Sequence, residues 1–283
     1  MKKNFIFTIT TGRSGQATLH KILKKFTLNC YSEFEAPSIN PIFPFFLGDI
    51  EKKIRRKFIE TNELLGRGKI ITAYENNDIG YITKIAKRRL VLIERKMENL
   101  QVDNYFDVSK FYIRGLYKGF NRMLNSVSLV FLVRDPLLNM KSFYNRKKNF
   151  LLDNSLPSAK SNLLRIDIKD LSKKELYLWS WAEIFLRYKK ISKSTKTSKA
   201  IMFKTEDLHS PEKIKKLFNF LNIKHTKINV IKKINTNEES GITKTIIEKD
   251  DLILLKDFIK KIPSYNIDLI RELKLSLKNN HIY

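Results

Sequence analysis

The sequence has little cysteine, little histidine and no long apolar run, and each shortage excludes a class of protein. The only cysteine is Cys30, so no disulfide framework can form within the chain, and a reducing compartment is expected. The four histidines are scattered without the spacing of metal ligands, which argues against a metal site. No apolar stretch is long enough to span a bilayer, and the apolar run from Phe5 to Thr10 is too short for the core of a signal peptide. We therefore expect a cytoplasmic protein without a transmembrane segment.

Acidic residues are scarce as well. The chain has 29 Asp and Glu against 55 Lys and Arg, a formal net charge of +26. Such an excess favours an anionic cofactor, an anionic acceptor, a membrane surface or nucleic acid as partner. The basic residues are spread along the whole chain, so a general compositional bias explains them as well as a selected patch does. Because they lack the aromatic and glycine interleaving of an RNA-binding module, we expect no specific nucleic-acid binding.

What the sequence does contain is a strong anion-binding signal close to its N-terminus. The apolar run Phe5–Thr10 has the composition of a buried strand, and an amphipathic segment from His20 to Phe26 follows after a short connection. A strand, a glycine-containing turn and a helix start present free backbone N–H groups and the positive end of the helix dipole to an anion. The connecting residues also supply one fixed positive charge and several hydroxyl groups; they are Thr11, Gly12, Arg13, Ser14, Gly15, Gln16, Ala17, Thr18 and Leu19.

This loop matches neither of the two common nucleotide-binding motifs. A P-loop has a Lys followed by Ser or Thr after its second glycine, and that pair is missing here. The dinucleotide motif requires Gly-x-Gly-x-x-Gly, and the glycines of this loop do not have that spacing, with Ser at position 14 and Thr at position 18. The arginine provides a planar, permanently charged fork that suits a tetrahedral oxyanion without a metal. The plainer alternative is that Gly12 and Gly15 only form a tight turn.

Strand-like and helix-like segments alternate along the chain, which predicts an α/β protein with a central, mostly parallel sheet and helices on both faces. We expect one domain over residues 1–283, with a polar segment at 149–172 as an acceptor-binding insertion or lid. The predicted strands after the first are 27–31, 105–110, 128–133 and 200–204. The predicted helices after the first are 50–65, 79–99, 111–124, 137–148, 173–191, 211–221, 250–261 and 267–277.

A second candidate anion site follows the predicted strand 128–133. Arg134 comes directly after this strand, and Ser142 and Arg146 share a face of the next helix. Ligands of parallel sheets bind outside the carboxyl ends of the strands, so the first loop and Arg134 line one crevice if their strands are neighbours. Two anion sites in one crevice suggest a nucleotide with phosphates at two separate positions. The alternatives are an Arg134 that pairs with Asp135 or another carboxylate, a Ser142 on the helix surface, and a solvated Arg146.

Together these segments resemble the sulfotransferases that use PAPS, 3′-phosphoadenosine 5′-phosphosulfate. Residues 11–19 resemble the 5′-phosphosulfate loop of that family, although Gln16-Ala17-Thr18 makes the loop apparently one residue longer. Residues 130–136 followed by Ser142 resemble its 3′-phosphate motif, and 203–208 with 218–221 resemble a later structural feature. The resemblance implies a P-loop NTPase-like three-layer fold. It implies that residues 12–19 hold the 5′-phosphosulfate, that Arg134 and Ser142 hold the 3′-phosphate, and that no metal is required.

Sulfuryl transfer needs a base that takes the acceptor proton and a positive group that stabilises the leaving phosphate. Arg13 is expected to be this positive group. Glu35, just before Ala36-Pro37, is the preferred base, because related sulfotransferases carry a Glu in this region. Glu33 is the alternative base. If neither is the base, both are ordinary loop glutamates. Asp107 and Ser109 are weaker candidates. His20 is expected to be structural.

The acceptor is expected to be a glycan or another small molecule, bound by the Glu33–Gly48 loop and the 149–172 segment, whose basic residues suit an anionic acceptor. The competing interpretations are a phosphotransferase that uses ATP, a basic nucleic-acid-binding protein, and a family member that binds nucleotide without turnover.

Overall fold

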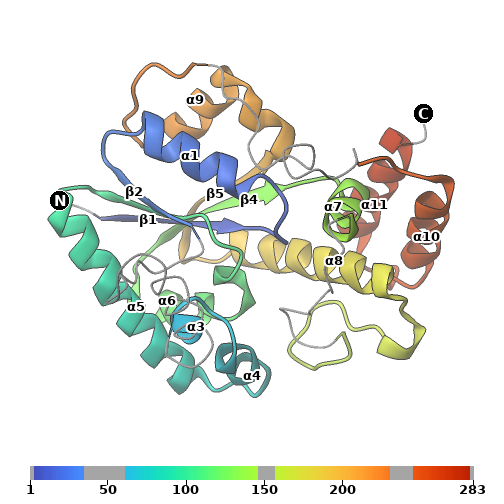
Figure 1. Cartoon of the computed structure of the whole chain (residues 1–283). Helices are drawn as coiled ribbons and strands as arrows, with labels where there is room; N and C mark the ends of the chain where they lie inside the picture. The colour runs from blue at the N-terminus through green and yellow to red at the C-terminus, as the bar shows by residue number, and fades with distance from the viewer. Residues whose placement is uncertain (1–2, 35–60, 146–156, 230–244, 281–283) are drawn as a thin grey trace, which may run out of the picture.

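A five-stranded parallel sheet forms the centre of the molecule (Figure 1). The computed structural model describes residues 3–34, 61–145, 157–229 and 245–280. The strands are β1 (Asn4–Ile9), β2 (Cys30–Glu33), β3 (Asn104–Asp107), β4 (Val127–Val133) and β5 (Thr197–Lys204). Their order is β2-β3-β1-β4-β5, and every neighbouring pair is parallel. The predicted α/β class is therefore confirmed, with a sheet that is wholly rather than mostly parallel.

Helices cover both faces of this sheet. The α-helices are α1 (Gln16–Phe26), α3 (Thr61–Leu64), α4 (Lys69–Glu75), α5 (Ile79–Asn99), α6 (Tyr117–Met123), α7 (Pro136–Tyr144), α8 (Lys173–Ser192), α9 (Pro211–Phe220), α10 (Lys249–Lys260) and α11 (Ile267–Asn280), and the short 3-10 turns are η1 (Tyr112–Arg114), η2 (Ile168–Asp170) and η3 (Thr205–His209). Helices α1 and α9 lie on one face, and α5, α6 and α8 on the other (Figure 1). No described helix is long and apolar enough to cross a membrane.

Alternation along the strands produces two hydrophobic cores, one on each face. In β1, Ile6 packs with Leu19 and other residues of the α1 and α9 layer, whereas Phe7 packs into the layer of α5, α6 and α8. Phe7 stacks on Tyr112 with a ring separation of 4.0 Å. Strands buried on both faces read as continuous apolar runs, which is why β1 and β4 were visible in the sequence.

The chain adds strands on both sides of β1, so the order of the strands changes direction next to β1. Strands β2 and β3 lie on one side of β1, and β4 and β5 lie on the other. Connections that leave β1 and β4 therefore diverge at the carboxyl edge of the sheet, where open α/β sheets bind their ligands. The condition that the two candidate anion-binding segments follow neighbouring strands is met, because β1 pairs with β4 from Ile6–Ser128 to Ile9–Phe131.

Most predicted elements exist, and the differences have local causes. Helix α5 has the predicted bounds. The second strand begins at Cys30 rather than Thr27, because the Thr27 hydroxyl and N–H both bond to Leu23 O at the end of α1. The predicted helix 111–124 is wrong as a single element and divides into η1 and α6 at Gly115. A Cβ there would lie 2.9 Å from Ile70 Cγ2, on a helix, α4, that was not predicted.

Other predicted ranges are shifted or only partly described. The strand predicted at 200–204 starts earlier, at Thr197. The helix predicted at 137–148 ends at Tyr144, and only residues 61–64 of the one predicted at 50–65 appear in a described helix. Residues 35–48 of the predicted pocket wall, Arg146 and residues 149–156 of the predicted insertion lie outside the described residues.

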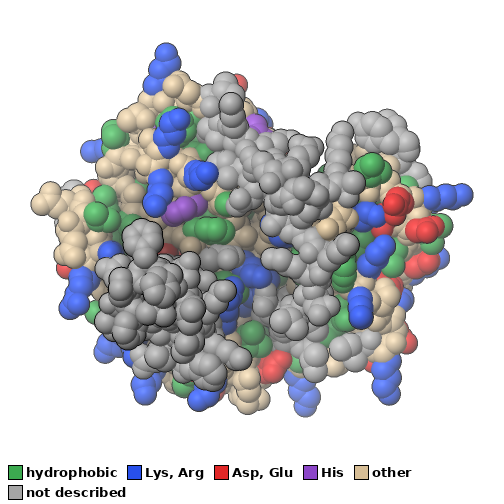
Figure 2. Space-filling view, viewed as in Figure 1, with side chains coloured by type: hydrophobic (Ala, Val, Ile, Leu, Met, Phe, Trp, Pro, Cys, Tyr) green, Lys and Arg blue, Asp and Glu red, His purple; other side chains and the backbone are tan. Residues whose placement is uncertain are grey.

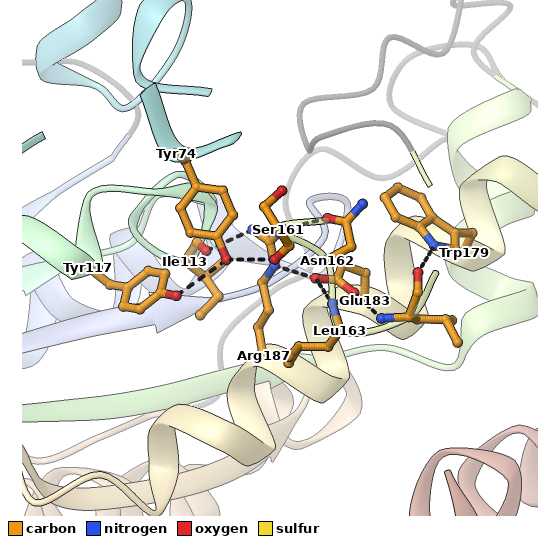
Figure 3. Close-up of polar contacts among 10 residues, drawn as sticks. Tyr74, Ile113, Tyr117, Ser161, Asn162, Leu163, Trp179, Glu183 and Arg187 are labelled. Atoms are coloured by element: carbon orange, nitrogen blue, oxygen red, sulfur yellow. Dashed lines mark hydrogen bonds and ion pairs between the residues drawn. The ribbon is translucent and has the colours of Figure 1, made fainter. Parts of the chain in front are cut away.

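The described part of the insertion is held against α8 by a buried ion pair (Figure 3). Arg187 Nε lies 2.6 Å from Glu183 Oε1, and both side chains are almost completely buried. The Glu183 carboxylate accepts the backbone N–H groups of Leu163 and Leu164, while Arg187 donates to Asn162 Oδ1 and Ile113 O. Residues 162–164 of the predicted insertion are thus fixed to the core by α8.

We expect Arg187→Met to destabilise the fold by about 3–5 kcal/mol, because Glu183 would keep a buried charge without its partner. Denaturant unfolding measures this directly. Lys216→Met, which breaks the exposed pair with Glu212 one helical turn away, is the control and should leave the unfolding midpoint unchanged. A loss of unfolding free energy below about 1 kcal/mol for Arg187→Met would show that this ion pair contributes little to the stability of the fold.

Candidate anion-binding site

The turn after β1 has a left-handed backbone. Gly12, Arg13 and Gly15 have φ angles of 93°, 58° and 82°. Gly15 is the N-cap of α1, and no side chain caps that helix. Among the described residues, nothing accepts a hydrogen bond from the backbone N–H groups of residues 15–18. The start of α1 therefore presents open donors and the positive end of the helix dipole at the carboxyl edge of the sheet.

Four donors from outside the turn hold its carbonyl oxygens. Thr11 O accepts from Arg114 Nη2 at 3.5 Å, and Gly12 O accepts from Asn139 Nδ2 at 3.0 Å. Arg13 O accepts from Arg134 Nη1 at 3.2 Å, and Ser14 O accepts from the Thr205 hydroxyl at 3.0 Å. With four successive carbonyl oxygens bound, the conformation of the turn is determined by its surroundings and not by glycine alone.

Asn139, a fully buried residue of α7, makes the central contact with the turn. Its Nδ2 also donates to Ser14 Oγ at 3.1 Å, and its Oδ1 accepts from Thr11 Oγ1 at 3.0 Å and from the Tyr177 hydroxyl. Both donors and both acceptor positions of the amide are thus used. Asn139 therefore joins the turn after β1 to helices α7 and α8.

Predicted loop residues divide into outward and inward groups. Arg13, Gly15 and Ala17 are partly exposed, whereas Ser14, Gln16, Thr18 and Leu19 are buried. Ser14 Oγ bonds within the turn, to Gly12 O at 3.2 Å. Gln16 Nε2 donates to Val108 O at 2.8 Å, so this side chain links the turn to the residue that follows β3. Ser14 and Gln16, two of the predicted ligand residues, therefore make bonds within the protein, while the backbone N–H groups of residues 15–18 are open among the described residues.

Arg134 lies beside this turn, at the end of β4. Asp135 accepts the N–H groups of Leu137 and Leu138 as the N-cap of α7, so its carboxylate does not pair with Arg134. Over the described ranges no carboxylate lies within 4.0 Å of the Arg134 guanidinium. Burial lowers the pKa of Arg134, although the charges of Glu206, Tyr177 and Asp135 act in the opposite direction. A bound anion would relieve the cost of this desolvated positive charge.

Arg13 and Arg114 also carry positive charge near the turn after β1. Burial raises the pKa of the Tyr177 hydroxyl, while its bond to Thr11 and the nearby charges of Arg114, Arg134 and Arg13 act to lower it. The positive charges of all three arginines therefore act on Tyr177, which bonds to Asn139 beside the turn. Lys and Arg side chains are visible near the middle of this face of the molecule, where Figure 1 places the carboxyl end of β1 (Figure 2).

Ser142 lies on α7, three residues after Asn139, so the two side chains share a face of the helix. It is buried, and no hydrogen bond to its hydroxyl is present among the described residues. Arg134, Asn139 and Ser142 thus come from one continuous segment, the end of β4 and the first turns of α7. The N-terminal end of this segment lies beside the loop, because Arg134 and Asn139 bond to the loop there.

Glu35, the predicted base, lies outside the described residues. Glu33, the alternative, pairs in register with Asp107 on β3. Arg89 Nη2 lies 2.7 Å from Asp107 Oδ2 and 3.7 Å from Glu33 Oε2, and the Tyr105 hydroxyl donates to Glu33 at 2.7 Å. Burial raises the pKa of Glu33, with Arg89 opposing the shift. Both strand-end carboxylates therefore belong to a buried network.

Ser109 and His20 also have structural partners. The backbone N–H of Ser109 donates to Asp107 Oδ1 at 2.7 Å, so the residue closes a turn after β3. His20 Nδ1 lies 2.7 Å from Ser32 Oγ, which joins α1 to β2. Burial lowers the pKa of His20 to about 4, so the imidazole is neutral at pH 7. This contact fits the structural role expected for His20.

Sequence reasoning missed the residues that support the turn from a distance, namely Arg114, Asn139, Tyr177 and Thr205. Thr205 follows the predicted strand 200–204, and this position was a usable signal. Asn139 and Tyr177 lie within helices and carried none. Comparisons of the sequence and the fold with known proteins found no matching family model, no matching curated protein and no matching solved structure. What the site does is therefore inferred from its residues.

We expect Gly15→Ala to destabilise the protein and Gly80→Ala, the control, to leave its stability unchanged or slightly higher. Gly15 has φ 82° and ψ 19°, a left-handed conformation that costs a non-glycine residue roughly 1–2 kcal/mol. A Cβ on Gly15 would also lie 2.5 Å from Leu208 Cδ1, and this overpacking should add about 1–3 kcal/mol, as measured by denaturant unfolding. Gly80 lies in α5, where the nearest atom to a Cβ is Asp78 Oδ1 at 3.6 Å, so alanine fits and favours the helix. A loss at Gly15→Ala below about 1 kcal/mol would show that the turn is not packed against η3.

Proposed function

We propose that this protein is a sulfotransferase of the PAPS-dependent, P-loop NTPase-like kind, which transfers a sulfuryl group to a hydroxyl or amine of an acceptor. The observation that carries the proposal is the direct contact between the two candidate anion sites. Arg134 Nη1 donates to Arg13 O at 3.2 Å, across the paired strands β1 and β4. A nucleotide with separate phosphates at its 5′ and 3′ positions matches two adjoining sites better than a nucleotide with a single phosphate chain does.

The residues present fit such a nucleotide. The open N–H groups of residues 15–18 and the Arg13 guanidinium suit the 5′-phosphosulfate. Arg134, desolvated and without a carboxylate within 4.0 Å among the described residues, and the buried hydroxyl of Ser142 suit the 3′-phosphate. An arginine in the loop instead of the P-loop lysine favours sulfuryl transfer over phosphoryl transfer from magnesium-ATP.

The chemistry required of the chain follows from this assignment. In the proposed reaction the acceptor atom forms a bond to sulfur while the sulfur–oxygen bond to the 5′-phosphate breaks. Arg13 and the loop N–H groups stabilise the negative charge that develops on the leaving phosphate. The acceptor proton passes to a carboxylate, for which Glu35 remains the candidate. Glu33 is less suited, because its carboxylate is already bound by Tyr105 and lies beside Arg89.

We expect the product nucleotide PAP, adenosine 3′,5′-bisphosphate, to bind in EDTA with a Kd on the order of micromolar. Arg134→Ala should weaken binding by roughly 10- to 100-fold, because a charge-assisted contact is lost. Isothermal titration calorimetry measures both values. Arg122→Ala, which removes an exposed arginine of α6, is the matched control and should bind PAP as the native chain does.

Two results would contradict the proposal. One is tight binding of magnesium-ATP without binding of PAP, which would indicate a phosphotransferase. The other is strongly salt-dependent binding of arbitrary RNA without binding of PAP, which would indicate a nucleic-acid-binding protein.

The candidate bases are separated by paired amide substitutions. Glu35→Gln should lower the rate of labelled sulfate transfer from PAPS to a panel of sugars, amino sugars and phenols by roughly 10²- to 10⁴-fold, with unchanged PAP affinity. Glu33→Gln should retain most of the activity, because the side chain serves the buried network around Arg89. If Glu33→Gln abolishes transfer and Glu35→Gln does not, the base is Glu33.

A further inference from the structure

Three helices meet at one fully buried carboxylate, that of Asp251 on α10 (Figure 1). Its oxygen atoms lie 2.9 Å from Lys141 Nζ of α7 and 3.2 Å from Lys174 Nζ of α8, and Oδ2 accepts the Glu248 backbone N–H at 3.0 Å. Burial acts to raise the pKa of Asp251, but the bonds from these three groups outweigh it and hold the pKa below its ordinary value. Asp251 is therefore charged at pH 7, and it binds one lysine from each of two neighbouring helices.

Both lysines lie close in sequence to residues that support the anion-binding turn. On α7, Lys141 comes two residues after Asn139, and on α8, Lys174 comes three residues before Tyr177, whose hydroxyl donates to Asn139 Oδ1. Residues two apart on a helix point to different sides, so Asn139 bonds to the turn while Lys141 reaches α10. Helix α7 is thus tied on one side to the turn and on another side to Asp251.

The two proposed phosphate subsites depend on the position of α7 to different degrees. Arg134 directly precedes Asp135, the N-cap of α7, and Ser142 lies near the other end of this short helix. The proposed 3′-phosphate ligands therefore move with α7. The loop, by contrast, is also held by Arg114 and Thr205, which do not belong to α7. A displacement of α7 should therefore disturb the 3′-phosphate subsite more than the 5′-phosphate subsite.

We propose that Asp251 is a positioning residue of the nucleotide site, which fixes α7 so that Arg134 and Ser142 are held in place for the 3′-phosphate. The proposal rests on the sulfotransferase function proposed above. Asp251 lies on α10, outside both proposed phosphate-binding segments, and acts on them through Lys141. In a buried ion pair the cost of desolvation offsets much of the attraction between the charges. The fixed geometry of the Asp251 contacts is therefore their main contribution.

The test compares the binding of PAP with that of adenosine 5′-phosphate, which lacks the 3′-phosphate, by isothermal titration calorimetry in EDTA. Asp251→Asn should weaken PAP binding by roughly 3- to 30-fold and adenosine 5′-phosphate binding by less than about twofold. Removal of a negative charge would by itself strengthen the binding of an anion, so weaker binding reports a change of position. Asp257→Asn, which breaks an exposed pair with Lys260 on the same helix, is the matched control and should bind both nucleotides as the native chain does.

Three further variants separate a change of position from a loss of folding. Lys141→Gln leaves Asp251 bound to Lys174 and the Glu248 N–H, so it should fold and show the same preferential loss of PAP binding. Lys174→Gln removes the same charge from the same carboxylate, but on α8, and should weaken PAP binding less. Ile93→Ala, a truncation in the core beside α5, should lower the thermal midpoint without changing the ratio of the two dissociation constants.

Native-like PAP affinity in both Asp251→Asn and Lys141→Gln would overturn the inference. Equal losses for the two nucleotides, or equal losses in Lys141→Gln and Lys174→Gln, would overturn it as well. A native chain that binds neither nucleotide would contradict the sulfotransferase function itself, together with the subsite that Asp251 is proposed to position. The two failures are distinct, because the first leaves PAP binding by the native chain intact.

Discussion

The arrangement of the candidate site depends on one buried amide, that of Asn139. Its two donors hold Gly12 O and Ser14 Oγ, and its two acceptor positions receive Thr11 Oγ1 and the Tyr177 hydroxyl. A left-handed turn that includes the non-glycine residue Arg13 is disfavoured in isolation, and these bonds compensate for the strain. Together with the bonds from Arg114, Arg134 and Thr205, they hold the carbonyl oxygens of the turn toward the protein. The open N–H groups at the start of α1 are thereby left for a ligand.

The buried residues Arg89 and Arg187 and the half-buried Arg134 differ in their partners. Arg89 lies 2.7 Å from Asp107 and Arg187 lies 2.6 Å from Glu183, so carboxylates within the core balance their charge. Arg134 instead donates to a backbone carbonyl oxygen, which holds its position and leaves its charge uncompensated by any carboxylate within 4.0 Å among the described residues. A partly desolvated charge like that of Arg134 is costly unless an anion offsets it. This difference is the reason why Arg134, and not Arg89 or Arg187, is the candidate anion ligand in the proposed function.

What could be predicted from the sequence was local. Helix α5 and strand β4 were found because their apolar patterns are long and regular, and the turn after β1 was found because glycine, arginine and hydroxyl residues cluster there. The break at Gly115 was not found, because it depends on α4 packing against that glycine from a distant part of the chain. Asn139 was missed for the same reason. A polar residue in a helix has no local mark that shows which distant carbonyl oxygen it will contact.

Helix α7 relates the two proposed phosphate positions to each other and to the C-terminal helices. It begins at the Asp135 cap beside Arg134, contacts the loop through Asn139, and carries Ser142 one turn later. Lys141 on the same helix lies 2.9 Å from the buried Asp251 of α10, and Asn280 of α11 donates to Asp135 at 3.2 Å. A shift of α7 would therefore move the support of the loop and the proposed 3′-phosphate ligands together. In this arrangement α10 and α11 act on the site indirectly, by keeping α7 at a fixed distance from the carboxyl edge of the sheet.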